Sequence, residues 1–186
     1  MKGTADEGIT LRKTNTLSLT GYCDANWGND LDNRRSTNGY CIFLGDSLVS
    51  WSSKKQSVVS NSTIEAKYRS LANATSEIVW LQSLLSELRV DVKTALVLWC
   101  DNTSTISLSA NPILHSRTKH VELDLYFVRE KVISKQLLVQ HVPSADQIAD
   151  ILTKPLSSQF FNRLKLKMSV CSPLQQAGGG KEVCLN

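Results

Sequence analysis

The sequence is poor in histidine and proline and contains no long hydrophobic run. Its three histidines, His115, His120 and His141, show no spacing typical of a metal site. The five cysteines include no close pair of metal-finger spacing, which argues against a zinc finger or zinc ribbon. Metal chemistry in this chain would therefore have to use other side chains.

No stretch is long and apolar enough to cross a bilayer, and no secretory leader is apparent. An odd number of cysteines in such a chain indicates reduced intracellular thiols. We therefore expect a protein of the cytoplasm or nucleus that is not secreted and has no membrane partner. We also expect the protein to be a monomer.

The overall composition is that of one globular domain. With 186 residues and 41% hydrophobic content, the chain can bury a core but is short for two domains. We expect a domain over residues 15–170, an irregular lead-in at residues 1–14, and a disordered tail at residues 171–186 that lacks an apolar period. The net charge of +4 permits a polyanionic partner without requiring one.

Hydrophobic periodicity predicts an α/β domain. Three antiparallel strands are expected first, at residues 17–26, 39–44 and 48–53. The elements expected after them are a helix at 63–88, a strand at 96–100, helices at 103–109 and 121–132, a strand at 137–142, and a terminal helix that begins at 146 and is interrupted near 155. Because the later strands connect through helices, they should run parallel, which gives a five-stranded mixed sheet flanked by helices.

Four acidic residues lie in apolar surroundings at the ends of these elements. Asp24 and Asp101 lie at or near the ends of predicted strands, while Glu65 and Asp150 open predicted helices. The carboxyl ends of parallel strands share a crevice, and carboxylates clustered there repel one another unless cations lie between them. Oxygen ligands of this kind select Mg²⁺ or Mn²⁺, and two such ions suit hydrolysis of a phosphodiester. The alternative is that Asp150 or Glu65, taken alone, is a helix cap or a turn residue.

Six short motifs occur in order between residues 2 and 170. They are Gly-Tyr-Cys-Asp-Ala-Asn-Trp at 21–27, Arg-Arg-Ser-Thr-Asn-Gly-Tyr at 34–40, Ser-Trp-Ser-Ser-Lys-Lys-Gln at 50–56, Cys-Asp-Asn at 100–102, Arg-Thr-Lys-His at 117–120 and Ala-Asp-Ile-Leu-Thr-Lys-Pro at 149–155. Together they resemble the ribonuclease H domain of copia-type LTR-retrotransposon Pol polyproteins.

The resemblance implies an RNase H-like fold and a metal-dependent endonuclease, a hydrolase that cuts the RNA strand of RNA–DNA hybrids. It assigns the acidic ligands of two Mg²⁺ or Mn²⁺ ions to Asp24, Glu65, Asp101 and Asp150. It also implies contacts with the hybrid by small polar residues and by a basic motif, namely Asn61, Ser62, Asn102, Thr103, Arg117, Lys119 and His120. For the basic motif, a solvated positive helix start is an equally good interpretation.

The resemblance also implies a partner. In a complete polyprotein this region follows the reverse transcriptase, whereas here a methionine stands just before residues 2–4, so we interpret the chain as a fragment or a relic of an element. The alternative to a ribonuclease is therefore a non-catalytic relic that binds nucleic acid.

The sequence departs from the family pattern at the predicted glutamate. The usual pattern is Ser-Ser-Thr-Glu-Ala-Glu-Tyr, whereas residues 62–68 read Ser-Thr-Ile-Glu-Ala-Lys-Tyr. Ile64 thus replaces a polar residue and Lys67 replaces an acid. A cation in the first turn of the helix is expected to compete electrostatically with metal.

Overall fold

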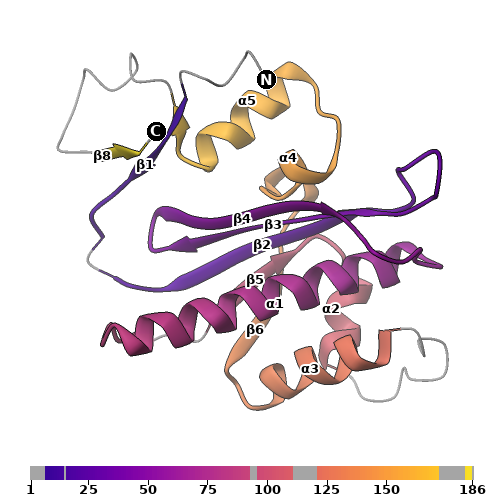
Figure 1. The fold of residues 1–186 in the computed structure, drawn as a ribbon, viewed down its shortest axis with the longest axis horizontal. Helices are drawn as coiled ribbons and strands as arrows, with labels where there is room; N and C mark the ends of the chain where they lie inside the picture. The colour runs from indigo at the N-terminus through magenta and orange to yellow at the C-terminus, as the bar shows by residue number, and fades with distance from the viewer. Residues whose placement is uncertain (1–6, 15, 93–95, 111–120, 172–182, 186) are drawn as a thin grey trace.

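The structure is a computed structural model that describes residues 7–14, 16–92, 96–110, 121–171 and 183–185. Its centre is a five-stranded sheet with the strand order β4-β3-β2-β5-β6 (Figure 1). The strands are β2 (Leu19–Asn26), β3 (Thr37–Leu44), β4 (Ser47–Lys55), β5 (Leu96–Cys100) and β6 (Leu137–His141). β2, β3 and β4 are antiparallel, whereas β5 runs parallel to β2 and to β6. The predicted mixed sheet is confirmed.

Helices lie on both sides of this sheet (Figure 1). α1 (Thr63–Glu87), α2 (Thr103–Ala110) and α3 (Glu122–Ile133) lie on one side, and α4 (Asp150–Thr153) and α5 (Ser158–Lys167) lie on the other. A 3₁₀ turn over Ser144–Asp146 precedes α4. None of the described helices is both long and apolar enough to cross a bilayer.

The terminal helix is shorter than predicted. We expected it to begin at residue 146, but α4 begins at Asp150 and ends after one turn. The residue after it, Lys154, is extended with φ −124° and ψ 146° because Pro155 disfavours a helical conformation in the residue before it. α5 then starts anew with Ser157 as its N-cap, whose side chain accepts a hydrogen bond from the backbone N–H of Phe160.

Two apolar clusters hold the layers together, one on each side of the sheet. Leu71 and Ile78 of α1 pack with Leu98 of β5 in the first cluster, and all three are fully buried. Alternate residues of β3 belong to different clusters, with Ile42 in the first and Phe43 in the second. β3 is therefore buried on both faces, which explains its nearly continuous apolar sequence.

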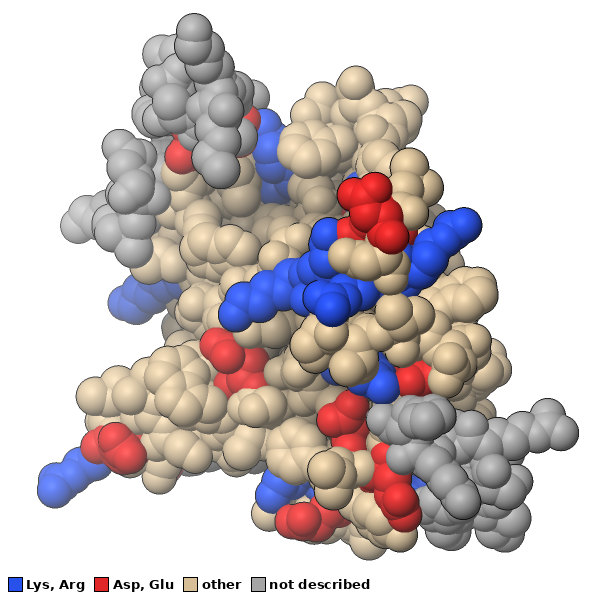
Figure 2. Space-filling view, turned by 45° about the vertical axis from the view of Figure 1, so that its right-hand side comes forward, with Lys and Arg blue, Asp and Glu red and all other residues tan. Residues whose placement is uncertain are grey.

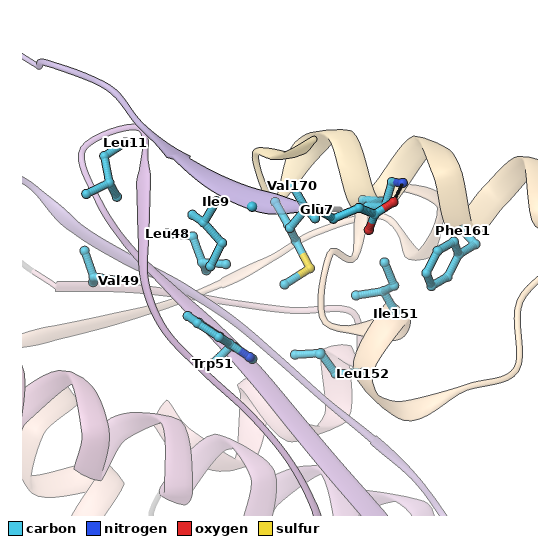
Figure 3. Close-up of a pocket in the computed structure, with 13 residues that line it drawn as sticks. Glu7, Ile9, Leu11, Leu48, Val49, Trp51, Ile151, Leu152, Phe161 and Val170 are labelled. Atoms are coloured by element: carbon cyan, nitrogen blue, oxygen red, sulfur yellow. Dashed lines mark hydrogen bonds and ion pairs between the residues drawn. The ribbon is translucent and has the colours of Figure 1, made fainter. Parts of the chain in front are cut away.

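An apolar pocket of about 810 Å³ opens beside the second cluster (Figure 3). Its lining includes Ile9, Leu48, Trp51, Leu152 and Phe161. Trp51 is half exposed, so the pocket leaves an aromatic side chain open to solvent on this side of the sheet.

A second, smaller sheet corrects the predictions for the two ends of the chain. β1 (Gly8–Leu11) pairs antiparallel with both β7 (Val170–Cys171) and β8 (Val183–Leu185). The predicted irregular lead-in therefore contains a strand, and the predicted disordered tail contributes to two; residues 1–6, 172–182 and 186 lie outside the described part of the chain. These strands were missed because two to four residues are too few to show a period, and their partners lie more than 150 positions away.

Candidate functional site

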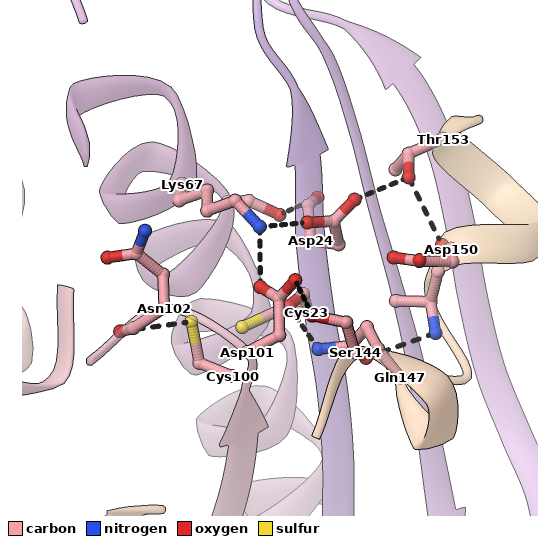
Figure 4. Close-up of polar contacts among 12 residues, drawn as sticks. Cys23, Asp24, Lys67, Cys100, Asp101, Asn102, Ser144, Gln147, Asp150 and Thr153 are labelled. Carbon is pink, nitrogen blue, oxygen red and sulfur yellow. Dashed lines mark hydrogen bonds and ion pairs between the residues drawn. The ribbon is translucent and has the colours of Figure 1, made fainter. Parts of the chain in front are cut away.

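Three of the four predicted carboxylates meet at the carboxyl end of the sheet (Figure 4). Asp24 lies in β2 and Asp101 directly follows β5. Tyr22 pairs with Trp99 in these parallel neighbours, so the two aspartates, each two residues further on, reach the same level. Asp150 opens α4, and each aspartate contributes an oxygen atom to a group whose members lie within 4.8 Å of one another.

Asp150 reaches this group because Gly39 allows α4 to lie against β3. Gly39 pairs with Asp24 across the sheet, and a Cβ atom at this position would lie 2.8 Å from side-chain atoms of both Leu152 and Thr153. The hydroxyl of Thr153 also donates a hydrogen bond of 2.6 Å to Oδ2 of Asp24. The missing side chain and this hydrogen bond together fix α4 beside the end of β2.

Two ammonium groups lie among the three carboxylates. Nζ of Lys67 is 2.7 Å from Oδ1 of Asp24 and 2.5 Å from Oδ1 of Asp101. Nζ of Lys154 is 2.8 Å from Oδ1 of Asp150 and 3.2 Å from Oδ2 of Asp24. The Lys67 side chain is only 9% exposed, compared with 29% for Lys154. Each aspartate therefore has a cationic partner from within the protein.

Burial and neighbouring charges move the pKa values of these groups in different directions. Burial would raise the pKa of Asp24, but attraction to Lys67, the hydrogen bond from Thr153 and attraction to Lys154 together hold that pKa below its usual value. Burial would lower the pKa of Lys67, but Asp24 and Asp101 hold that pKa above the usual lysine value. For Asp150, burial and repulsion by Asp24 and Asp101 outweigh the hydrogen bond from Lys154 and raise the pKa to about 6.

Glu65, the fourth predicted ligand, is not part of this three-residue group. One of its carboxylate oxygens lies 2.8 Å from Nη2 of Arg69, and the other accepts a hydrogen bond of 2.8 Å from the backbone N–H of Asn61. The backbone N–H of Glu65 in turn donates to the side chain of Ser62, the N-cap of α1. These contacts organise the first turn of α1, as the helix-cap interpretation expects. A metal-binding role for Glu65 stays a prediction.

The predicted substrate contacts are placed only in part. Asn102 accepts hydrogen bonds from the backbone N–H and the hydroxyl of Thr105, and so caps α2, while Thr103 is the exposed first residue of that helix. The predicted basic contacts Arg117, Lys119 and His120 lie outside the described residues.

The sequence contained a signal for Lys67 that the prediction of Glu65 did not use. Lys67 precedes Leu71, Ala74 and Ile78 by four, seven and eleven positions, the spacing of a single helix face, and that face is buried against the sheet. By contrast, nothing in the sequence announced Gln147, whose side-chain amide donates a hydrogen bond of 3.1 Å to the backbone carbonyl of Cys23 and ties the segment before α4 to β2.

Comparisons with known proteins identify relatives of the chain. It is 49% identical over 179 residues to the "Retrovirus-related Pol polyprotein from transposon RE2" of Arabidopsis thaliana, an alignment that covers 96% of this chain and 12% of the relative. A match to the transposon TNT 1-94 polyprotein of Nicotiana tabacum is 34% identical over 165 residues and covers 89% of this chain and 12% of the relative. The chain is a homologue of copia-type retrotransposon Pol polyproteins. The chain spans about 12% of the length of these curated relatives, and no family model matches it.

Solved structures identify the fold of this Pol homologue. LC11-RNase H1 in complex with an RNA/DNA hybrid superimposes with a TM-score of 0.53 at 14% identity, covering 73% of this chain and 94% of that chain. A second structure of LC11-RNase H1, isolated from compost, gives a TM-score of 0.53 at 12% identity and covers 80% of this chain and 98% of that one. The predicted RNase H-like fold is confirmed.

The ribonuclease H fold generally uses divalent metal ions, and the side chains of this Pol homologue fit such an ion only in part. Three aspartates supply the carboxylate oxygens that Mg²⁺ and Mn²⁺ accept. However, the ammonium group of Lys67 bonds to one oxygen of Asp24 and to one oxygen of Asp101, so two of the three carboxylates already share a cation of the protein. The carboxylate ligands suit such an ion, but the protein already supplies these carboxylates with a cation of its own, the ammonium group of Lys67.

Proposed function

We propose that this chain is a ribonuclease H-type endonuclease domain that binds RNA–DNA hybrids and hydrolyses their RNA strand, slowly when isolated. The observation that carries the proposal is the group of three aspartates, held at the carboxyl ends of two parallel strands and at the start of α4. This is where an open α/β sheet binds ligands, and the residues are of the type that phosphodiester hydrolysis requires.

Mg²⁺ or Mn²⁺ bound at this site would stabilise the negative charge that develops on the oxygens of the cleaved phosphate. The protein's contribution is to hold the ligands in place. Asp24 is almost fully buried, and its Oδ2 is fixed by the hydroxyl of Thr153. Asp101 accepts a hydrogen bond of 3.4 Å from the hydroxyl of Ser144 at its other oxygen. Carboxylates fixed in this way can hold an ion without reorganising during the reaction.

Exposed cations next to this edge of the sheet support binding of a nucleic acid. Figure 2 shows Lys and Arg side chains in a band across one face of the molecule. Arg34 and Arg35 are exposed in the loop between β2 and β3, and Lys54 is exposed at the end of β4, opposite Asn38. Since Gly39 pairs with Asp24, these cations lie just beyond the level of the acidic group. Phosphates bound there would bring a duplex close to the aspartates.

The relatives support a partner for the domain. Each relative is a Pol polyprotein of which the region aligned with this chain makes up 12%, so each is about eight times as long as that region. We propose that an upstream reverse transcriptase supplies much of the grip on the hybrid, because few phosphate contacts are available from a chain with a net charge of +4.

A second candidate function is binding of the hybrid without hydrolysis. The observation that favours it is the pair of ammonium groups, from Lys67 and Lys154, already bonded to the three carboxylates. A site neutralised in this way can lie next to a phosphate while holding no ion that would activate a water molecule for attack on it.

One experiment separates the two functions. A hybrid carrying a labelled RNA strand is incubated with the chain in Mg²⁺ or in Mn²⁺, and binding of the same hybrid is measured separately in EDTA. The endonuclease proposal expects cleavage of the RNA strand, faster in Mn²⁺, that disappears in Asp101→Asn while binding in EDTA is kept. Binding without cleavage in either ion would select the second function, and no preference of the chain for hybrid over duplex DNA would count against both.

A further inference from the structure

The phase of α1 decides which of two neighbouring residues faces the aspartates. Residues two apart on an α-helix point about 200° apart around its axis, so Glu65 and Lys67 cannot both face the end of the sheet. The carboxylate of Glu65 is directed toward Arg69 and the backbone of Asn61. The ammonium of Lys67 lies between Asp24 and Asp101 (Figure 4). Position 67, rather than position 65, therefore belongs to the site.

We infer that Lys67 is a built-in counter-ion that occupies the cation position of the site and weakens the binding of divalent ions by Asp24, Asp101 and Asp150. This inference rests on the proposed function in one respect, because both take the three aspartates as the group that binds the ion. The family pattern has an acid at position 67, and the exchange of that acid for a lysine removes one negative charge and adds one positive charge at the same point. The lysine therefore competes with the ion for the carboxylates of Asp24 and Asp101.

The geometry explains why Lys67 cannot easily give way. Its Nζ lies 2.7 Å and 2.5 Å from the two carboxylate oxygens, and only 9% of its side chain is exposed, because it lies on the face of α1 that packs on the sheet. A Mg²⁺ ion needs its oxygens at about 2.0–2.1 Å, so it would have to replace this ammonium. Lys154 differs, because its side chain is 29% exposed and can turn toward solvent from the open side of the site.

The inference is tested by ion binding, with activity as a secondary measurement. Mn²⁺ is titrated into the full 186-residue chain by calorimetry, comparing the wild type with Lys67→Glu and with the neutral Lys67→Gln. We expect Lys67→Glu to bind Mn²⁺ at least about tenfold more tightly than the wild type, with Lys67→Gln between them, since glutamine removes the positive charge next to the ion and glutamate also adds a negative one. Equal affinity of the wild type and Lys67→Glu would overturn the inference.

Thermal unfolding supplies a second readout that does not depend on the nuclease reaction. In EDTA, Lys67→Glu should melt below the wild type because four acidic side chains then face one another, and Mn²⁺ should restore its melting temperature. Mn²⁺ should raise the melting temperature of the wild type much less, since its carboxylates already have an internal cation. A wild type that Mn²⁺ stabilises as strongly as it stabilises Lys67→Glu would also overturn the inference.

A matched control separates a local effect from a change of overall charge. Lys13→Glu makes the same change of charge at an exposed position between β1 and β2, outside the acidic group and outside the proposed phosphate contacts, and should leave Mn²⁺ affinity as in the wild type. A tighter affinity in Lys13→Glu similar to that of Lys67→Glu would attribute the effect to net charge and reject the local role of Lys67.

Hybrid binding in EDTA keeps this inference distinguishable from the proposed function. If neither the wild type nor Lys67→Glu prefers the hybrid, the proposed function fails while the calorimetry still decides the role of Lys67. If both bind the hybrid and Lys67→Glu alone cleaves it quickly, the site is a hydrolytic one that Lys67 suppresses.

Discussion

The hydroxyl of Thr153 donates a hydrogen bond of 2.6 Å to Oδ2 of Asp24, joining residues 129 positions apart in the sequence. Both side chains are buried. The bond links α4 directly to the central strand β2, so the position of Asp150 relative to Asp24 depends on it.

Replacement of Thr153 should therefore reduce stability. We expect Thr153→Val to lower the free energy of unfolding by about 1–3 kcal/mol, because a buried carboxylate loses a hydrogen-bond donor while the shape of the side chain is kept. Urea unfolding at neutral pH measures the effect. Thr153→Ser keeps the hydroxyl and is the matched control; a loss in Thr153→Ser as large as that in Thr153→Val would show that the hydroxyl is not the main contribution of this side chain to stability.

The raised pKa of Asp150 predicts a specific dependence of stability on pH. Its pKa is about 6 in the folded chain, compared with an ordinary value of 3.8, so the folded state binds the proton more tightly than the unfolded state. The contribution of Asp150 to stability is therefore most favourable below pH 3.8 and declines as the pH rises toward 6.

Asp150→Asn removes this dependence without changing the size of the side chain. We expect the wild type to lose stability relative to Asp150→Asn as the pH rises from 4 to 7. The free energy of unfolding of both proteins is measured by urea unfolding in EDTA. Comparison of the two proteins cancels the titration of other groups. A difference that stays constant over this range would show that Asp150 titrates as it does in the unfolded chain.

Gly39 should tolerate a side chain less well than Gly21, although both are glycines of the central sheet. A Cβ atom at Gly39 would lie 2.8 Å from Cβ of Leu152, an atom that cannot move without its backbone, whereas a Cβ at Gly21 would meet the flexible end of Leu98. We expect Gly39→Ala to lower the free energy of unfolding by about 1–3 kcal/mol and Gly21→Ala by less. Thermal unfolding of the two variants, side by side, checks the order; the reverse order would mean that α4 adapts easily to the sheet.

Glu65 offers a test of the fourth ligand. In the Lys67→Glu background, where ion binding is expected to be measurable, Glu65→Gln should change Mn²⁺ affinity by less than about twofold, because its carboxylate serves Arg69 and the backbone of Asn61. Asp101→Asn in the same background should abolish binding. A loss in Glu65→Gln comparable to that in Asp101→Asn would establish Glu65 as a ligand after all.

The sequence was sufficient for the central sheet and for three members of the site because these depend on local patterns. Asp24 and Asp101 each close a run of apolar residues, and parallel strands bring such ends together without further information. Asp150 was predictable as part of a helix that could reach that edge, but the start of α4 at Asp150 and its single-turn length were not. The length reflects the conformation that Pro155 imposes on Lys154.

The assignment at positions 65 and 67 depends on the phase of a helix, which motif matching alone does not resolve. Both positions lie in the first turns of α1, and an acidic residue at 65 was the natural choice of ligand. The apolar residues Leu71, Ala74 and Ile78 fix the phase, and it is their burial that places Lys67 in the site. The hydrogen bond from Gln147 to Cys23 and the pairing of β1 with β8 join distant segments, and no local pattern encodes such contacts.

The register of the small sheet has a mechanical consequence. β1 and β8 are antiparallel, with Ile9 opposite Leu185 and Leu11 opposite Val183, so the first residue of β1 and the last residue of β8 lie at the same end of the ladder. Tension applied to these two points would break the backbone hydrogen bonds between β1 and β8 one after another, rather than load all of them together in shear. A pull on both ends would thus be absorbed by peeling β8 from β1, and the five-stranded sheet that carries the aspartates would feel little of the force.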